Sequence, residues 1–326
     1  MAKPKKTESS PTKDLLTRIR ERYKLMVEAD EDNRRLALED LKFTNIPGEQ
    51  WDAVMKKERG DRPCYEFNKL RVTCKRVIND MRANRPAGKV RGVEDGDKDT
   101  AEIYEGLIRN IWNTSDGDTA IDHAAEYQVE GGMGAWRVIT EYAYDSAFDQ
   151  DILIKGIPNP FCLYFDPSAK DPMHRDAQDC ILTERISKAA YKRRWPNAEV
   201  VEWESTEFDD DEEWQDDETV RICEYWWKEP VQKELWQLED GKVIDAASDE
   251  AALIPPETIK RKRSAICNQV KMVIASGEAI LEGPTEWAGK HIPFVMVYDE
   301  KMVIDGKVYW WGLPRFGKDA QRSYNL

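Results

Sequence analysis

The chain has 326 residues, a length that allows about two domains and a sizeable core. Its twelve tryptophans and twelve tyrosines exclude a disordered chain, because disordered segments are poor in aromatic residues. The formal net charge is −14, which argues against a protein that holds DNA tightly, because such proteins usually neutralise phosphates with Lys and Arg. No apolar run approaches the roughly 20 residues that span a bilayer, so we expect no contact with a membrane.

The start of the chain and the cysteines carry no sign of secretion. Residues 1–12 are predicted to be a flexible polar tail, because their positive charges are not followed by the apolar stretch of a signal peptide. The six cysteines are scattered without a Cys-x-x-Cys pair. This pattern indicates free thiols made in a reducing compartment, and neither a disulfide framework nor a zinc site.

Residues 13–134 are predicted to be a helical region. The stretch Lys13–Phe43 contains neither Gly nor Pro. Its apolar residues recur at helical spacing, as Leu15, Leu16, Ile19, Tyr23, Met26 and Val27. After two loops, Asn68 is expected to cap a second helix that ends at Asn84, just before an Arg-Pro pair.

Two further helices are expected before the character of the chain changes. One covers 97–113, and its apolar stripe consists of Ile103, Leu107, Ile108 and Ile111. The other covers 118–128 and is stopped by the glycines that follow. The run Gly131–Gly134 is not predicted to bind phosphate, because a phosphate loop follows a strand and ends in Lys-Ser/Thr. It is interpreted as a helix C-cap and a tight turn.

Residues 135–311 are predicted to be a β-rich region, in which polar turns separate runs of β-branched and aromatic residues. The expected strands are 135–144, 151–157, 161–165, 180–186, 220–227, 233–238, 242–244 and 266–275, with a short helix over 187–195. The predicted fold class is therefore α+β, with N-terminal helices followed by an antiparallel β-rich unit.

The last segment, 312–326, is predicted to be the start of a helix. No Gly, Pro or other C-terminal signal appears before Leu326, so we expect this helix to continue and the chain to be the front part of a longer protein.

No catalytic constellation is evident, and neither a metal nor a cofactor is expected. The histidines His123, His174 and His291 are isolated, without a second ligand at metal-binding spacing. One alternative is a metal-dependent nucleic-acid-processing enzyme, in which Asp166, Asp176, Asp179 and an acidic run hold Mg²⁺ for phosphoryl chemistry. We regard an enzyme as the weaker interpretation.

The acidic run covers 207–218 and lacks the alternating spacing of a calcium-binding loop. It is interpreted as a solvated loop, and its aromatic residues suggest docking onto another surface through Asp209, Asp210, Asp211 and Trp214. The basic cluster Lys260–Arg263 could contact DNA or the acidic run of another copy, or could be an exposed hairpin flank.

Several motifs occur in an order that resembles the portal proteins of short-tailed, podovirus-type double-stranded DNA phages. They are Trp51 with Arg59-x-x-Arg62-Pro63, Gly132-Met-Gly-Ala-Trp-Arg-Val138, Ile157-Pro-Asn-Pro160 through Asp166-Pro167, Glu224-Tyr-Trp-Trp227, Trp287-Ala-Gly-Lys-His-Ile-Pro-Phe294, and Gly312-Leu-Pro-Arg-Phe-Gly-Lys-Asp-Ala-Gln-Arg-Ser-Tyr-Asn325. Each motif alone is weak, but together they span most of the chain.

The resemblance implies a structural protein without catalytic activity, corresponding to the wing and body of a portal before its stem. Portal proteins of this kind form a ring, typically dodecameric, at a capsid vertex. The ring nucleates head assembly and passes DNA during packaging and ejection. Terminase, scaffolding and coat proteins and a tail adaptor would be partners, in the virion and, before assembly, in the host cytoplasm. The expected subunit contacts are Trp51, Arg59, Arg62, Arg315, Lys318, Gln321 and Arg322.

Overall fold

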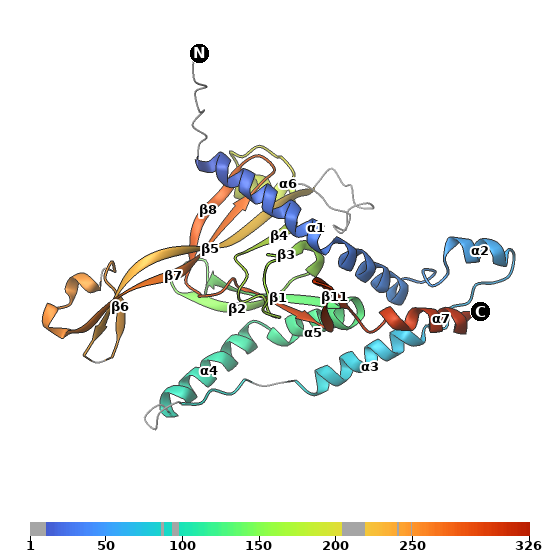
Figure 1. Ribbon diagram of the computed structural model, residues 1–326, viewed down its shortest axis with the longest axis horizontal. Coiled ribbons are helices and arrows are strands. Elements are labelled where there is room, and N and C mark those ends of the chain that lie inside the picture. The colour runs from blue at the N-terminus through green and yellow to red at the C-terminus, as the bar shows by residue number, and fades with distance from the viewer. Residues whose placement is uncertain (1–10, 86–87, 93–97, 204–218, 240, 249) are drawn as a thin grey trace, which may run out of the picture.

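A computed structural model describes residues 11–85, 88–92, 98–203, 219–239, 241–248 and 250–326. The strands form a central body, and helices lie on both sides of it (Figure 1). The long helix α1 (Pro11–Asn45) crosses one side, whereas α3 (Lys69–Ala83), α4 (Lys98–Thr114) and α5 (Gly117–Gly131) lie along the other. A two-stranded ribbon formed by β5 (Thr219–Leu238) and β7 (Ile259–Ala275) projects from the body at the left of the view.

The helices follow the predicted order, except that the short helix α2 was not predicted. Their bounds are α1 Pro11–Asn45, α2 Ala53–Arg59, α3 Lys69–Ala83, α4 Lys98–Thr114, α5 Gly117–Gly131, α6 Lys188–Arg194 and α7 Lys318–Asn325. Asn68 caps α3 as predicted, because its side chain accepts a hydrogen bond from the backbone N–H of Arg71 at 2.9 Å. None of the helices in the described part of the chain is long and apolar enough to span a bilayer.

The glycine run after α5 is a helix end and a close packing site. Gly132 has φ 96° and its N–H bonds to the carbonyl of Gln128, so it is the predicted C-cap. A Cβ atom on Gly134 would lie 1.9 Å from the carbonyl oxygen of Ala124, so only glycine fits where β1 passes this helix.

Helix α4 exposes its apolar stripe. A stripe of this kind ordinarily faces the core. Here Ile103 is 71% exposed, Leu107 48% and Ile108 46%, while Ala101 is the buried residue of the helix. The hydrophobic spacing correctly predicts the helix but does not identify the surface that covers it.

All strand pairs in the described residues are antiparallel, which together with the preceding helices confirms the predicted α+β class. A three-stranded sheet has the order β2-β1-β9, a two-stranded hairpin pairs β10 with β11, and the six-stranded sheet has the order β3-β4-β5-β7-β8, with β6 on β5. The bounds are β1 Met133–Tyr142, β2 Gln150–Gly156, β3 Leu163–Phe165, β4 Asp179–Ser187, β5 Thr219–Leu238, β6 Val243–Asp245, β7 Ile259–Ala275, β8 Ile280–Trp287, β9 Phe294–Tyr298, β10 Glu300–Ile304 and β11 Lys307–Trp311.

Three predicted boundaries are wrong. The separate strands 220–227 and 233–238 are one 20-residue strand, β5, which passes through Pro230 because β7 pairs with it continuously from Cys223 to Leu238. Strand β7 begins at Ile259, so the basic cluster lies within it. Residues 160–162 are a short 3-10 turn before β3. The division of the chain into a tail, a helical region, a β-rich region and a final helix stays a prediction.

The six-stranded sheet has a core on each face. Because side chains alternate along a strand, Tyr225 and Trp227 pack against Tyr23 and neighbouring residues of α1. Trp226 lies on the opposite face, in a cluster with Phe294 of the three-stranded sheet. The two faces thereby join α1 and both larger sheets into one body.

Candidate subunit-contact site

The residues predicted for subunit contact lie in or next to α2 and α7, and Figure 1 shows both helices at one end of the molecule, where α7 packs against α3. Helix α7 is held there by Gln321, which is 4% exposed. Its side-chain oxygen accepts hydrogen bonds from the N–H groups of Lys69 at 2.9 Å and Leu70 at 3.3 Å, and its amide donates to the carbonyl of Phe67 at 3.1 Å. Gln321 thus provides a hydrogen-bond acceptor for the first turn of α3, whose N–H groups have no partner within that helix.

Asn325 continues this contact one helical turn later. Its amide donates to the side-chain oxygen of Gln50 at 2.7 Å, and its own oxygen accepts from the N–H of Phe67 at 3.1 Å. Both Asn325 and Gln50 are buried. Buried polar groups of this kind are costly unless paired, so the network fixes α7 in one position.

A buried carboxylate anchors the beginning of the same segment. The side chain of Asp40 on α1 is fully buried, and it forms ion pairs with Arg315 and with Lys318, the latter at 2.6 Å. The side chains of both cations are also largely buried, at 14% and 13% exposure. Removing one partner of such a pair leaves an uncompensated charge in the interior.

Trp51 and Arg59 shape the loop between α2 and α3. The indole N–H of Trp51 donates to the carbonyl of Tyr65 at 3.1 Å, and the ring is 4% exposed. The guanidinium of Arg59 lies 4.7 Å from the centre of that ring and donates to the carbonyl of Pro63 at 3.0 Å. Glu66 holds the other side of the loop through the N–H groups of residues 48 and 50.

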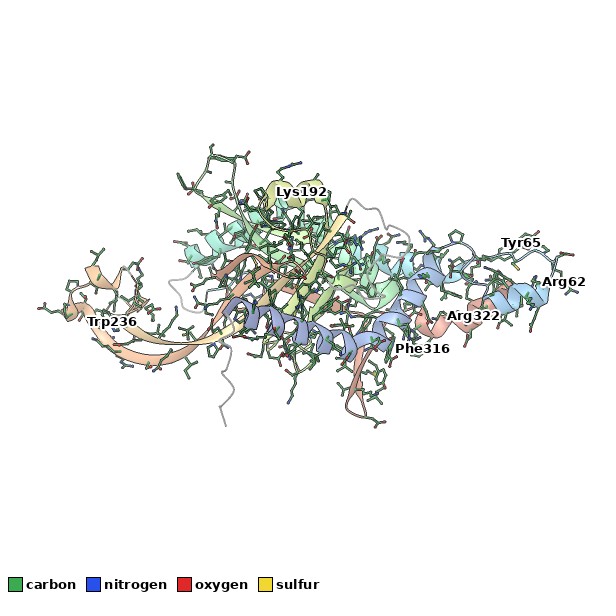
Figure 2. The ribbon with its side chains drawn as sticks, turned by 90° about the horizontal axis from the view of Figure 1, so that it is seen from above. Arg62, Tyr65, Lys192, Trp236, Phe316 and Arg322 are labelled. Carbon is green, nitrogen blue, oxygen red and sulfur yellow. The ribbon has the colours of Figure 1, made fainter. Side chains whose placement is uncertain are left out.

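An aromatic and cationic surface results, which we call the basic-aromatic end. It consists of Arg62, Tyr65, Phe67, Arg322 and Tyr324. Phe67 lies edge-on to Tyr324 at 6.3 Å, and all three aromatic rings are more than half exposed. Arg62, Tyr65 and Arg322 are seen at the right of Figure 2, away from the body. Tyr, Trp and Arg are the residues that most often anchor protein interfaces.

The predicted site residues therefore fall into two groups. Trp51, Arg315, Lys318 and Gln321 make their contacts inside the chain, and Arg59 is stacked on Trp51. Arg62 is exposed, whereas Arg322 is only partly exposed, because its guanidinium lies over the ring of Phe43 and pairs with Asp319. Their contact with another subunit stays a proposal.

The aromatic members of the basic-aromatic end were not predicted. The available signal was the alternation of aromatic residues over 65–67, two residues after Pro63. Their proximity to Tyr324 joins segments more than 250 residues apart, so local sequence alone could not reveal it.

The carboxylates of the alternative hypothesis have other partners. Asp179 accepts hydrogen bonds from the guanidinium of Arg22 at 2.6 and 2.7 Å and from the hydroxyl of Tyr225 at 3.1 Å. Asp176 instead accepts from the N–H groups of Lys170 and Asp171 at the surface. Within the described residues, no group of three His, Cys, Asp or Glu side chains is placed to hold a metal ion. The geometry gives no support to a shared Mg²⁺ site.

Asp166, considered for the same site, also has hydrogen-bond partners within the chain. Burial by itself raises the pKa of Asp166, but the N–H groups of Ser168 and Gln178 and the Arg22 guanidinium outweigh it and lower the pKa below its usual value. The carboxylate is therefore an ionised structural group. The acidic run with Asp209, Asp210, Asp211 and Trp214 lies outside the described residues.

Comparison with known families decides the relationship. Residues 20–326 match the model of the phage P22-like portal protein family. The chain belongs to this family. The match covers the basic-aromatic end, both larger sheets and α7, so the fold described above is that of a portal-family chain.

A curated relative agrees with this assignment. The chain is 28% identical over 324 residues to a portal protein of Acyrthosiphon pisum secondary endosymbiont phage 1. The alignment covers 90% of this chain and 44% of the relative, so the chain spans less than half the length of the portal protein that it matches.

Proposed function

We propose that this chain is a structural portal subunit of a tailed phage, which assembles with identical copies into a ring at a capsid vertex. The family match over residues 20–326 is the observation that carries the proposal. Double-stranded DNA would pass through the ring during packaging and ejection, and the ring would nucleate assembly of the head. The subunit would be found in the virion at the portal vertex and in the host cytoplasm before assembly.

The proposed partners are other proteins of the phage head and tail. Terminase, scaffolding and coat proteins and a tail adaptor would bind the ring, and ATP hydrolysis would be left to the terminase. The subunit itself would have no catalytic activity and need no cofactor. Asp179 and Asp176, the carboxylates considered for catalysis, support this view. Asp179 already accepts hydrogen bonds from Arg22, and Asp176 accepts them from backbone N–H groups.

The net charge supports passage of DNA over firm binding. Each phosphate contact with Lys or Arg releases counterions and adds affinity. A chain with a net charge of −14 repels DNA at long range, so a ring of such subunits offers a path on which the duplex can move.

The basic-aromatic end is the proposed contact between neighbouring subunits. Arg62 and Arg322 reach solvent there, whereas Trp51, Arg59, Arg315, Lys318 and Gln321 position the surface from within the chain. Each residue predicted for subunit contact is thus proposed either to touch the neighbouring subunit or to hold the contact surface in place.

The test is the mass of the purified chain in solution, measured by light scattering at micromolar concentration and combined with negative-stain images. We expect an oligomer of defined mass with a ring shape. If the chain is monomeric, and a version extended to the length of its relatives is monomeric as well, the proposed ring function is wrong. A ring formed only by the extended version would place further contacts beyond residue 326.

A further inference from the structure

Helix α4 presents an apolar surface that the described part of the chain leaves uncovered. This α4 stripe consists of Ile103, Tyr104, Leu107 and Ile108, which are 71%, 55%, 48% and 46% exposed. The four residues follow helical spacing and form one continuous row. A contiguous exposed apolar row on a helix marks an interaction site more often than isolated apolar residues do.

The surroundings of the α4 stripe are acidic. Residues 98–131 contain eight carboxylates and two cations. Asp118, Asp122 and Glu126 form ion pairs with Arg82, Arg85 or Lys75 of the neighbouring segment. Asp99 and Glu102 make no ion pair among the described residues, and Asp99 lies one helical turn before Ile103. The α4 stripe therefore suits a partner with apolar or aromatic groups and positive charge.

The basic-aromatic end has this character. Residues 51–71 contain six cations and four carboxylates, the reverse of the balance in the whole chain. Tyr65, Phe67 and Tyr324 are 61%, 57% and 58% exposed. Figure 1 shows α2 and α7 at the right and α4 at the lower left, so the two surfaces lie at opposite ends of the helical side of the molecule.

We propose that the basic-aromatic end of one copy docks on the α4 stripe of the next copy. This inference rests on the proposed ring function and names the surfaces that would join its subunits. A contact between two different surfaces of identical chains is head-to-tail, and it closes into a ring when the rotation between copies allows. The exposed aromatic rings would fill the apolar row, and Arg62 would face the carboxylates of Asp99 and Glu102.

Two variants, each with one surface altered, test this arrangement. The first carries Arg62→Glu and Tyr65→Ser, and the second carries Leu107→Asp and Ile108→Asp. All four side chains are exposed, so both variants should fold. Circular dichroism melting curves would verify that they do. We expect each variant alone to need at least a tenfold higher concentration than the unaltered chain to associate.

An equimolar mixture of the two variants gives the decisive measurement. Each variant keeps one intact surface, so the mixture should form dimers by sedimentation or light scattering, and nothing larger. Matched controls are Lys192→Glu on α6, seen on another side of the molecule in Figure 2, and Leu253→Asp, whose side chain is 85% exposed. Both controls should associate like the unaltered chain.

The possible results separate this inference from the ring function. If the unaltered chain associates and either variant associates equally well, the two surfaces are not the contact, although the ring function stands. Two impaired variants that stay monomeric when mixed would also overturn the head-to-tail pairing. If the unaltered chain does not associate at all, the pairing is overturned, whereas the ring function is rejected only if the version extended to the length of its relatives is monomeric as well.

Discussion

Single buried polar residues determine how the portal-family chain holds its C-terminal segment. Gln321 is the clearest case, because one side chain serves two N–H groups and one carbonyl of a segment about 250 residues earlier in the chain. An apolar replacement would leave those part-buried backbone groups without their hydrogen-bond partner. Such groups cost more free energy when unpaired than their hydrogen bonds contribute when formed.

Replacing this glutamine should therefore destabilise the folded chain measurably. For Gln321→Ala we expect a loss of about 2–3 kcal/mol in the free energy of unfolding, from the unpaired N–H groups at the start of α3. Urea unfolding followed by circular dichroism measures it. The matched control is Ser323→Ala, an exposed position on the same helix, which should change stability by no more than about 0.5 kcal/mol. Equal stability of the two variants would show that Gln321 is not a structural anchor.

His174 is expected to make stability depend on pH. Burial and the nearby Lys301 lower the pKa of this imidazole from 6.5 to about 4. Its ring stacks on Phe165 at 4.8 Å, and its Nε2 atom lies 3.0 Å from the hydroxyl of Tyr298. Because the unfolded chain binds a proton near pH 6.5 and the folded chain only near pH 4, stability is lost as the pH falls through this interval.

The magnitude can be checked with one substitution. Between pH 8 and pH 5 the imidazole should lower the free energy of unfolding by roughly 2 kcal/mol. In His174→Asn this part of the pH dependence should disappear, and Asn tolerates the φ of 54° found at this position. Urea unfolding curves at both pH values give the comparison. An unchanged slope in the variant would mean that His174 titrates normally.

At the scale of elements, the attachment of α1 depends on ion pairs between this helix and the six-stranded sheet. Arg22 reaches from α1 to Asp179 on β4 and to Asp166 after β3, and the two carboxylates are only 3% and 4% exposed. The hydrogen bond with Asp179 outweighs burial and raises the pKa of Arg22 above its usual value.

Replacing only the cation of this ion pair should lower the free energy of unfolding more than replacing the cation and its carboxylate partner together. Arg22→Met is expected to lower the free energy of unfolding by about 3–5 kcal/mol, because two carboxylates stay buried without their cation. Adding Asp179→Asn should restore part of the loss. These two variants, Asp179→Asn alone and the unaltered chain form the double-mutant cycle, and thermal and urea unfolding measure the stability of each. If the double variant is less stable than Arg22→Met alone, the ion pair does not control the attachment of α1.

Sequence reasoning located most elements because their ends are marked locally. Asn68 caps α3 and Gly132 ends α5, and each acts through neighbours within four residues. Pairing across the chain overrides such local marks: Pro230 does not interrupt β5, because β7 extends alongside it. The buried contacts of Gln321 and the exposure of the α4 stripe were beyond sequence reasoning, since both depend on which distant surfaces meet.

At the scale of the whole molecule, the projecting β5–β7 ribbon carries a small core of its own. Leu238, Ile244 and Ala251 pack there with Trp236, Ile254 and Ile259, and this cluster shares no residue with the cores of the body. Figure 2 shows Trp236 at the far end of the ribbon, well away from the other labelled residues. A part whose apolar contacts are internal contributes little to the folding of the rest.

Shortening the ribbon should accordingly leave the body intact. Glu234 pairs directly with Ser264, so Asn-Gly in place of residues 235–263 provides a two-residue turn between paired strands. We expect the free energy of unfolding to change by less than about 1 kcal/mol, because the sheet residues that contact α1 lie earlier in β5 and later in β7. Urea unfolding monitored by near-ultraviolet circular dichroism measures this change. The slope of the free energy of unfolding against urea concentration should be slightly smaller, because unfolding of the shortened chain exposes less surface. A loss of several kcal/mol would instead show that the ribbon and the body fold as one unit.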